Sequence, residues 1–105
     1  MARFTVYRNK NPGSKTVFPY LVDVQSDLLS TMETRVVIPL TRAPGLTKRP
    51  VSQLTPAIQF QDEFYVLMTP HMAGIATRDL GPSAGSLEGW RDTVMSAVDF
   101  LLSGY

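Results

Sequence analysis

Apolar residues recur at helical spacing over the last nineteen residues of the chain, 87–105. Those on one helix face are Trp90, Val94, Ala97, Val98 and Leu101. Met95 and Leu102 lie beyond one edge of this face, and Phe100 lies beyond the other. At about 100° per residue the apolar arc covers roughly 220°, whereas seating on one core requires little more than ~100°. We therefore predict a terminal helix that is covered in part by something other than its own domain.

Short runs of alternating or β-branched apolar residues predict strands upstream of this helix. The expected strands cover residues 2–7, 17–24, 35–40, 57–61, 64–69 and 75–80. The first has the alternation of a half-buried strand. Pro19 lacks a ladder donor and suggests an edge position or a bulge for the second, and Pro39 stops or bends the third. Residues 57–61 and 64–69, joined across Asp62-Glu63, have the pattern of a hairpin.

The connections between these strands complete the predicted fold. Residues 9–15 read as a turn and 41–56 as the longest irregular stretch. In the connection 25–34, one helical turn is expected to bring three apolar side chains to the core: Leu28, Leu29 and Met32. Residues 81–86 read as a flexible joint, with Ser86 as the N-cap of the terminal helix. The expected fold is mainly β with one C-terminal helix, a small antiparallel barrel or sheet on which the helix packs.

Composition narrows the class of protein. A chain of 105 residues makes one domain, 1–105, which is large enough to bury a hydrophobic core without disulfide bonds or a structural metal. The net charge of +1 is too small to attract nucleic acid or an anionic membrane electrostatically. Without cysteine there is no disulfide, thiol nucleophile or Cys-ligated metal. The first residues lack a signal-peptide pattern and no run approaches ~18 apolar residues, so we expect a cytoplasmic protein.

Candidate catalytic residues are few. The chain has no glycine-rich phosphate loop and neither the H-E-x-x-H nor the G-x-S-x-G pattern. His71, the only histidine, is either a general base or, as we favour, a turn residue after Pro70. Arg78 and Asp79 suggest a metal-free ribonuclease, but adjacent strand residues point to opposite faces, so a solvated strand edge is the favoured interpretation. We expect no cofactor and no metal.

Three other groups of residues suggest contacts. The polar patch Asp23, Gln25, Ser26 and Asp27 binds a partner or, as we favour, satisfies backbone groups of a turn. Arg42, Lys48 and Arg49 form a basic loop that meets an acidic partner or simply faces solvent, and Trp90 reads as a core residue. At the C-terminus, the aromatic residue Tyr105 follows the helix-ending Gly104, which suggests that these residues contact a partner protein. Docking of the same residues on a second protomer of this chain is an equal alternative.

Several segments together resemble the CcdB family, the toxins of bacterial toxin–antitoxin pairs. They are FTVYRN near the start, YLVDVQSDLL (20–29), TRVVIPL (34–40), MTPHMAG (68–74) and VDFLLSGY (98–105). The resemblance implies an SH3-like antiparallel barrel with a C-terminal helix, assembled as a homodimer. It implies no enzymatic activity: such toxins bind the A subunit of DNA gyrase and trap its cleaved complex with DNA. A CcdA-like antitoxin neutralises them through a disordered segment, and operator DNA is reached only through the antitoxin complex, which autoregulates transcription.

The resemblance also suggests site residues. The expected gyrase contacts lie on the helix and the last residues: Asp99, Leu102, Ser103, Gly104 and Tyr105. Plasmid-borne members end in Trp-Gly-Ile; here Gly104 matches, Ser103 stands in place of the tryptophan and Tyr105 in place of the isoleucine.

Two further sets of predicted contact residues follow from the sequence itself. The wide apolar arc assigns Met95 and Leu102 to the dimer interface, and two basic loops assign the antitoxin contacts to Arg8, Lys10, Lys48 and Arg49. Two alternatives stay open: a MazF- or Kid-like ribonuclease toxin on the same fold, and a non-toxic homologue that only binds antitoxin.

Overall fold

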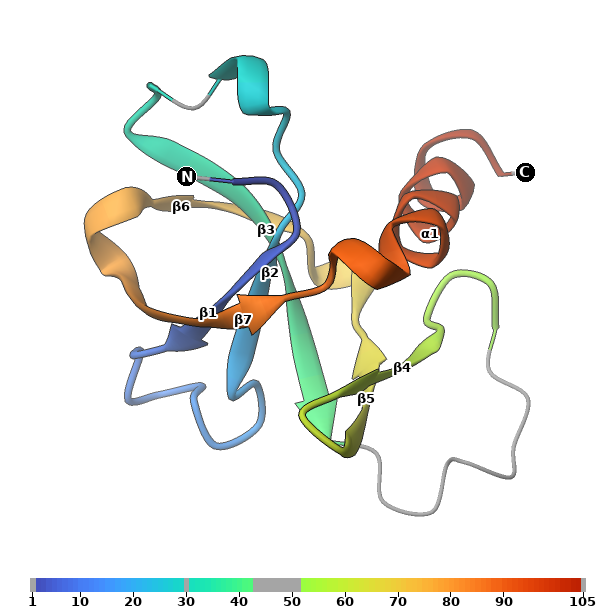
Figure 1. Ribbon diagram of the computed structural model, residues 1–105, viewed down its shortest axis with the longest axis horizontal. Helices are drawn as coiled ribbons and strands as arrows, with labels where there is room; N and C mark the ends of the chain where they lie inside the picture. The colour runs from blue at the N-terminus through green and yellow to red at the C-terminus, as the bar shows by residue number, and fades with distance from the viewer. Residues whose placement is uncertain (1, 30, 43–51, 105) are drawn as a thin grey trace.

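One curled antiparallel sheet and a C-terminal helix make up the protein, of which the computed structural model describes residues 2–29, 31–42 and 52–104. The strands are β1 (Thr5–Asn9), β2 (Tyr20–Asp23), β3 (Thr34–Arg42), β4 (Ala57–Phe60), β5 (Glu63–Leu67), β6 (Ala73–Ala76) and β7 (Leu80–Ser86). They pair in the order β4-β5-β3-β2-β1-β7, and β6 also pairs with β3. The helix α1 spans Arg91–Ser103 (Figure 1). The predicted fold class is confirmed.

The long strand β3 organises the sheet. One of its edges pairs with β2, while its other edge pairs first with β6, from Thr34 to Val37, and then with β5, from Leu40 to Arg42. Pro39 lies between these two stretches, and its carbonyl accepts a hydrogen bond from Met68 N at 2.9 Å. A proline is tolerated at this point because its missing donor does not face the β2 ladder. Of the two effects predicted for Pro39, that it stops the strand is therefore wrong, and that it bends the strand stays a prediction.

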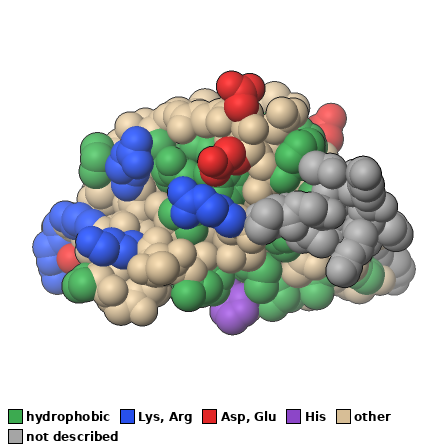
Figure 2. All heavy atoms as spheres, turned by 90° about the horizontal axis from the view of Figure 1, so that it is seen from below, with side chains coloured by type: hydrophobic (Ala, Val, Ile, Leu, Met, Phe, Trp, Pro, Cys, Tyr) green, Lys and Arg blue, Asp and Glu red, His purple; other side chains and the backbone are tan. Residues whose placement is uncertain are grey.

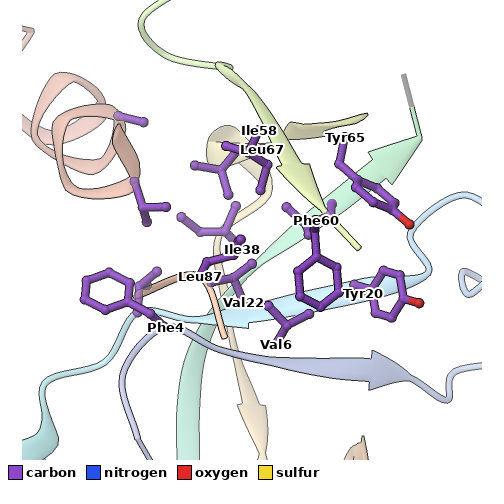
Figure 3. Close-up of a cluster of buried hydrophobic side chains, with 14 of the residues drawn as sticks. Phe4, Val6, Tyr20, Val22, Ile38, Ile58, Phe60, Tyr65, Leu67 and Leu87 are labelled. Carbon is purple, nitrogen blue, oxygen red and sulfur yellow. The ribbon is translucent and has the colours of Figure 1, made fainter. Parts of the chain in front are cut away.

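Both faces of the sheet are buried. The main core lies under α1 and the β4–β5 hairpin and includes Phe4, Val6, Tyr20, Ile38 and Leu87 (Figure 3). A second cluster on the opposite face contains Tyr7, Leu21, Val37 and Leu80. Because the consecutive residues Val6 and Tyr7 are both buried, β1 is not the half-buried strand that its alternation predicts. The strand β2 likewise lies between β1 and β3 and not at an edge, with Pro19 just before it.

The helix α1 packs through the predicted face at its middle, where Val94, Ala97 and Val98 are buried and Trp90 is half-buried against the core. A 3-10 turn, η5 (Glu88–Trp90), precedes it, and the Ser86 hydroxyl accepts a hydrogen bond from Glu88 N at 3.0 Å. The N-cap position of α1 is Trp90 and that of η5 is Leu87, so the prediction that Ser86 caps the terminal helix is wrong; the chain reaches the α conformation only after this extra turn. No helix of the described residues is long and apolar enough to cross a membrane.

The segment 73–86 differs most from its prediction. The expected strand 75–80 is split between β6 and a 3-10 turn, η4 (Thr77–Asp79), and the expected joint 81–86 is strand β7. A Cβ at Gly81 would lie 2.4 Å from the Arg8 carbonyl oxygen, and Gly85 has φ +152° beside the Phe60 ring. These glycines permit close strand pairing, which composition alone cannot distinguish from flexibility.

The hairpin is confirmed with a shifted turn. The strands β4 and β5 pair from Ala57↔Val66 to Phe60↔Glu63. Gln61 and Asp62 form the turn with φ 52° and 65°, the left-handed conformation of both central residues in a type I′ turn. The turn therefore comes one residue earlier than expected.

Candidate partner-binding surface

The C-terminal end of α1 is exposed and apolar. Leu102 is 70% exposed and Leu101 36%, and Asp99, Ser103 and Gly104 are also exposed. Figure 1 shows this end of the helix at the outer side of the molecule, away from the sheet. Leu101 was expected on the buried face; that prediction is wrong, because the last turn of the helix extends beyond the side chains that bury its middle.

The helix ends at Gly104, whose φ of +78° is left-handed and whose N–H donates to the Phe100 carbonyl at 2.8 Å. This geometry is the glycine C-cap that redirects the chain after a helix. A side chain at Gly104 would meet no atom within 4 Å, so its cost would come from the backbone conformation alone. Tyr105 lies outside the described residues.

A second exposed apolar patch lies on the connection between β2 and β3. It carries the 3-10 turn η1 (Asp27–Leu29), where Leu28 is 94% exposed and Leu29 46%; Met32, further along, is 49% exposed. We call these three residues the η1 patch. The prediction that they reach the core is wrong, because the space beneath the turn is filled by charged side chains.

Beneath the η1 patch lies a fully buried ion pair. Arg35 Nε is 2.7 Å from Asp23 Oδ2 and its Nη2 is 3.0 Å from Asp23 Oδ1, and both side chains are 0% exposed. Arg35 Nη1 also reaches the Leu29 carbonyl at 3.4 Å, and the Gln25 amide donates to the same oxygen at 3.2 Å. Because these bonds fix the backbone of the turn, they hold the η1 patch away from the core.

The polar patch 23–27 satisfies backbone groups, as the favoured interpretation predicts. Gln25 N donates to Asp23 Oδ1 at 3.0 Å, and Leu28 N donates to the Ser26 hydroxyl at 3.2 Å. Arg3 N donates to Asp27 Oδ1 at 2.7 Å. The sequence signal for this network is an Asp and an Arg inside otherwise apolar strands, since charged residues are almost never fully buried unless paired.

Arg3 links the η1 turn to α1. Its backbone bonds to Asp27, while its guanidinium Nη2 lies 3.2 Å from Met95 Sδ on the helix. Met95 is half-buried and packs against the main core. Part of the wide apolar arc of α1 is thus covered within the chain itself, and Leu102 remains its most exposed member.

Of the expected antitoxin residues, the structure describes Arg8 and Lys10. The guanidinium of Arg8 lies 5.7 Å from the Tyr20 ring centre, on the main-core face of β1. Lys10 lies instead at a cavity on the other face, beside Asn9. Lys48 and Arg49 lie outside the described residues. Arg42 pairs with Glu63 at 3.5 Å, with both side chains more than half exposed.

That cavity brings together two of the weak catalytic candidates. It has a volume of about 790 Å³ and is lined by His71 and Asp79, but not by Arg78. The His71 ring packs on Phe18 with centroids 5.6 Å apart, and the residue belongs to the turn η3 (Thr69–His71), as the favoured interpretation predicts. Asp79 and Arg78 lie on η4, so the argument from alternating strand faces does not apply to them. Figure 2 shows the single histidine at the edge of the molecule's underside.

Two buried tyrosines have a raised pKa. Burial, and then the hydrogen bond that its hydroxyl donates to Glu63 Oε2 at 3.0 Å, raises the pKa of Tyr65 to about 12. Burial, and then the negative charge of Asp23, raises the pKa of Tyr7. In the described part of the chain, no group of three or more His, Cys, Asp and Glu is arranged to hold a metal ion. The exposed apolar residues, rather than a catalytic cluster, dominate the candidate site.

Comparison with known protein families agrees with this picture. The family model described as CcdB protein matches residues 3–104, essentially the whole chain. The match includes every strand and the terminal helix with its exposed end. The chain therefore belongs to the CcdB family, the toxins of toxin–antitoxin systems that poison DNA gyrase.

Proposed function

We propose that this chain binds the A subunit of DNA gyrase, traps the cleaved gyrase–DNA complex and acts by binding rather than catalysis. The observation that carries the proposal is the exposed apolar end of α1, where Leu102 is 70% exposed. Fully burying a leucine side chain is worth roughly 1.5–3 kcal/mol, so a partner that covers this end gains affinity from it.

The proposed gyrase contacts are four exposed residues of that end, Asp99, Leu102, Ser103 and Gly104, together with Tyr105, which lies outside the described residues. Gly104 supports the assignment because its left-handed backbone ends α1 at this point. Asp99 adds a charge beside the leucines, and charge gives an interface specificity more than raw affinity.

The η1 patch extends this contact surface in our proposal. Leu28 is 94% exposed and lies in the same connection as the exposed Leu29 and Met32, and a group of exposed apolar residues, unlike a single one, is typical of a contact surface. Arg3 joins the η1 turn to α1, because its backbone N–H donates to Asp27 and its guanidinium contacts Met95. A partner that covers both would bury the two best-exposed leucines of the described chain.

We further propose a homodimer with Leu102 and Met95 at its interface. Leu102 is the stronger member, since Met95 is half-buried within its own chain. A CcdA-like antitoxin would neutralise the toxin through Arg8, Lys10, Lys48 and Arg49. Arg8 lies over Tyr20, whereas Lys10, which follows β1, lines the cavity, so one antitoxin segment would have to pass around the end of that strand to reach both.

The test is expression in a gyrase-sensitive strain and in one whose gyrase A subunit is altered. Gyrase poisoning predicts growth arrest only in the sensitive strain, with cleaved gyrase–DNA complexes in extracts. Arrest in both strains together with RNA cleavage would support a ribonuclease, and no arrest with retained antitoxin binding would support a non-toxic homologue.

Matched variants locate the contact. Leu102→Ser should abolish arrest, whereas Val17→Ser should not, although Val17 is also an exposed aliphatic residue at 58%. Val17 lies in the turn between β1 and β2, outside the proposed surface. Equal toxicity of Leu102→Ser and the unmodified chain would remove the α1 end from the proposed site.

A further inference from the structure

One hydrogen bond between the connection 24–33 and β3 is made by a side chain in place of the backbone. Val24 lies opposite Val36, one step beyond the end of the β2–β3 register, and Val24 N donates to Val36 O at 2.9 Å. In a regular antiparallel ladder such a pair exchanges two bonds, so Val36 N would donate to the Val24 carbonyl. Here Val36 N donates instead to Gln25 Oε1 at 3.0 Å, while the Val24 carbonyl accepts from Arg3 Nε at 3.3 Å. The Gln25 side chain therefore replaces a backbone acceptor where the chain leaves β2.

The other end of the same carboxamide holds the η1 turn. Gln25 Nε2 donates to the Leu29 carbonyl at 3.2 Å, and Met32 N donates to that carbonyl at 3.1 Å. Gln25 itself is only 7% exposed. Its backbone is anchored to the buried ion pair on both sides, because its N–H donates to Asp23 Oδ1 at 3.0 Å and its carbonyl accepts from Arg35 Nη2 at 3.4 Å. One buried amide thus joins β3 to the turn that carries the η1 patch.

The chemistry of this bridge explains why a glutamine lies here. The Val36 N–H needs an acceptor and the Leu29 carbonyl needs a donor, and a carboxamide supplies both on one short side chain. The carboxylate of a glutamate supplies only acceptors, and the thioether of a methionine supplies no donor. Because the bridge is buried, a partner left without its bond at either end would be costly.

We propose that Gln25 is the positioning residue of the η1 patch: its amide holds Leu28, Leu29 and Met32 in the arrangement that the gyrase A subunit contacts. Gln25 acts through the turn and not by touching the partner, since it lies almost completely buried. Side chains that are already ordered before binding spare the complex the cost of ordering them. This inference rests on the proposed function, because it takes the η1 patch to be part of the gyrase contact.

Two variants separate the two ends of the bridge. Gln25→Glu keeps an acceptor for Val36 N but removes the donor to the Leu29 carbonyl, whereas Gln25→Met removes both bonds. By hydrogen exchange in NMR, the Leu29 and Met32 amides should exchange faster in both variants, and the Val36 amide should exchange faster only in Gln25→Met. A residue that merely stabilises the whole fold would lower the protection of all core amides together. Unchanged exchange at Leu29 and Met32 in both variants would overturn the proposal.

Affinity for the gyrase A subunit is the second measurement. Both Gln25 variants should bind at least about tenfold more weakly, because gyrase must then order the side chains of the patch itself. Ile58→Val is the matched control, since Ile58 is buried on β4, which pairs through β5 with the opposite end of β3. This control should lower the melting temperature without changing gyrase affinity or exchange in the η1 turn. Faster exchange in the Gln25 variants with unchanged gyrase affinity would overturn the positioning role.

Leu28→Ser distinguishes a failure of this inference from a failure of the proposed function. Leu28 is 94% exposed, so its replacement changes the contact without touching the bridge. We expect Leu28→Ser to weaken gyrase binding while the Leu29 and Val36 amides keep their protection. If Leu28→Ser weakens binding and the Gln25 variants do not, the positioning role alone is wrong. If Leu28→Ser binds gyrase as tightly as the unmodified chain, the η1 patch is no gyrase contact and both proposals are wrong.

Discussion

The ion pair beneath the η1 patch offers the most quantitative test of the structure. Arg35 contacts Asp23 through two hydrogen bonds of 2.7 and 3.0 Å, and both side chains are completely buried. Asp23→Asn keeps the shape of the side chain but leaves the guanidinium without its counter-charge. Arg35→Met keeps an unbranched side chain but leaves the carboxylate without its cation. The double variant removes both charges together.

Breaking a buried ion pair by removing one partner typically costs 3–5 kcal/mol, about what we expect from each single variant. A domain of this size has a free energy of unfolding of roughly 5–15 kcal/mol, so either change consumes a large share of it. Replacing both charges is often far less costly, since no uncompensated charge remains in the interior. We therefore expect the double variant to lose at least about 2 kcal/mol less than the sum of the single losses, the size of coupling seen between residues in one network.

Urea unfolding followed by circular dichroism measures these free energies, with the midpoint and slope compared among the variants. The control is Arg91→Met, which removes the Arg91–Glu88 pair at 3.2 Å, where both side chains are 59% exposed. An exposed pair of this kind is worth less than about 1 kcal/mol, so the control should remain close to the unmodified chain. Additive losses, or a loss below about 1 kcal/mol for Asp23→Asn, would refute the description of Asp23 and Arg35 as a coupled buried pair.

Three further predictions separate the contact surface from the core. Deleting residues 103–105 should lower stability by no more than about 1 kcal/mol, since surface changes cost little, yet abolish growth arrest; a melt lowered by many degrees would show that the tail is structural. Gly104→Val should abolish arrest in the same way, because a φ of +78° disfavours a branched residue, and retained toxicity would contradict the proposed role of the cap. Leu102→Asp should give a well-folded monomer in sedimentation, and a stable dimer would remove Leu102 from the interface.

The raised pKa of the buried Tyr65 predicts how the stability of the protein changes at alkaline pH. The folded pKa of Tyr65, about 12, exceeds the ordinary value of 10.0, so the unfolded chain releases this proton first. Stability is therefore fully present below pH 10 and falls as pH rises toward 12, by up to roughly 2–3 kcal/mol for two pKa units. Tyr65→Phe should flatten the stability curve over this range. An unchanged slope between pH 10 and 12 would show that another group titrates there.

The parts of the fold that the sequence predicts correctly are those where one local rule acts alone. The middle of α1 follows a 3.6-residue apolar period against a single core, so Val94, Ala97 and Val98 are buried as expected. The β4–β5 hairpin follows from two apolar runs separated by a polar pair. In the segment 73–86, by contrast, pairing with a distant strand determines the secondary structure. Its glycines and proline predict a flexible joint, but residues 80–86 pair with β1 and form strand β7.

The residues of the proposed contact surface are the ones whose burial the pattern cannot predict. An interface and a core both select aliphatic side chains at helical spacing, so Val98 and Leu101 carry the same signal although one is buried and the other exposed. What distinguishes them is the length of α1 relative to the side chains beneath it, which only the assembled sheet determines. In the η1 patch, too, the assembled core determines which apolar residues are exposed. Leu28 is exposed because Asp23 and Arg35 occupy the interior beneath it, and their pairing joins residues twelve positions apart. A surface that binds a partner is thus specified by what the core excludes as well as by what it contains.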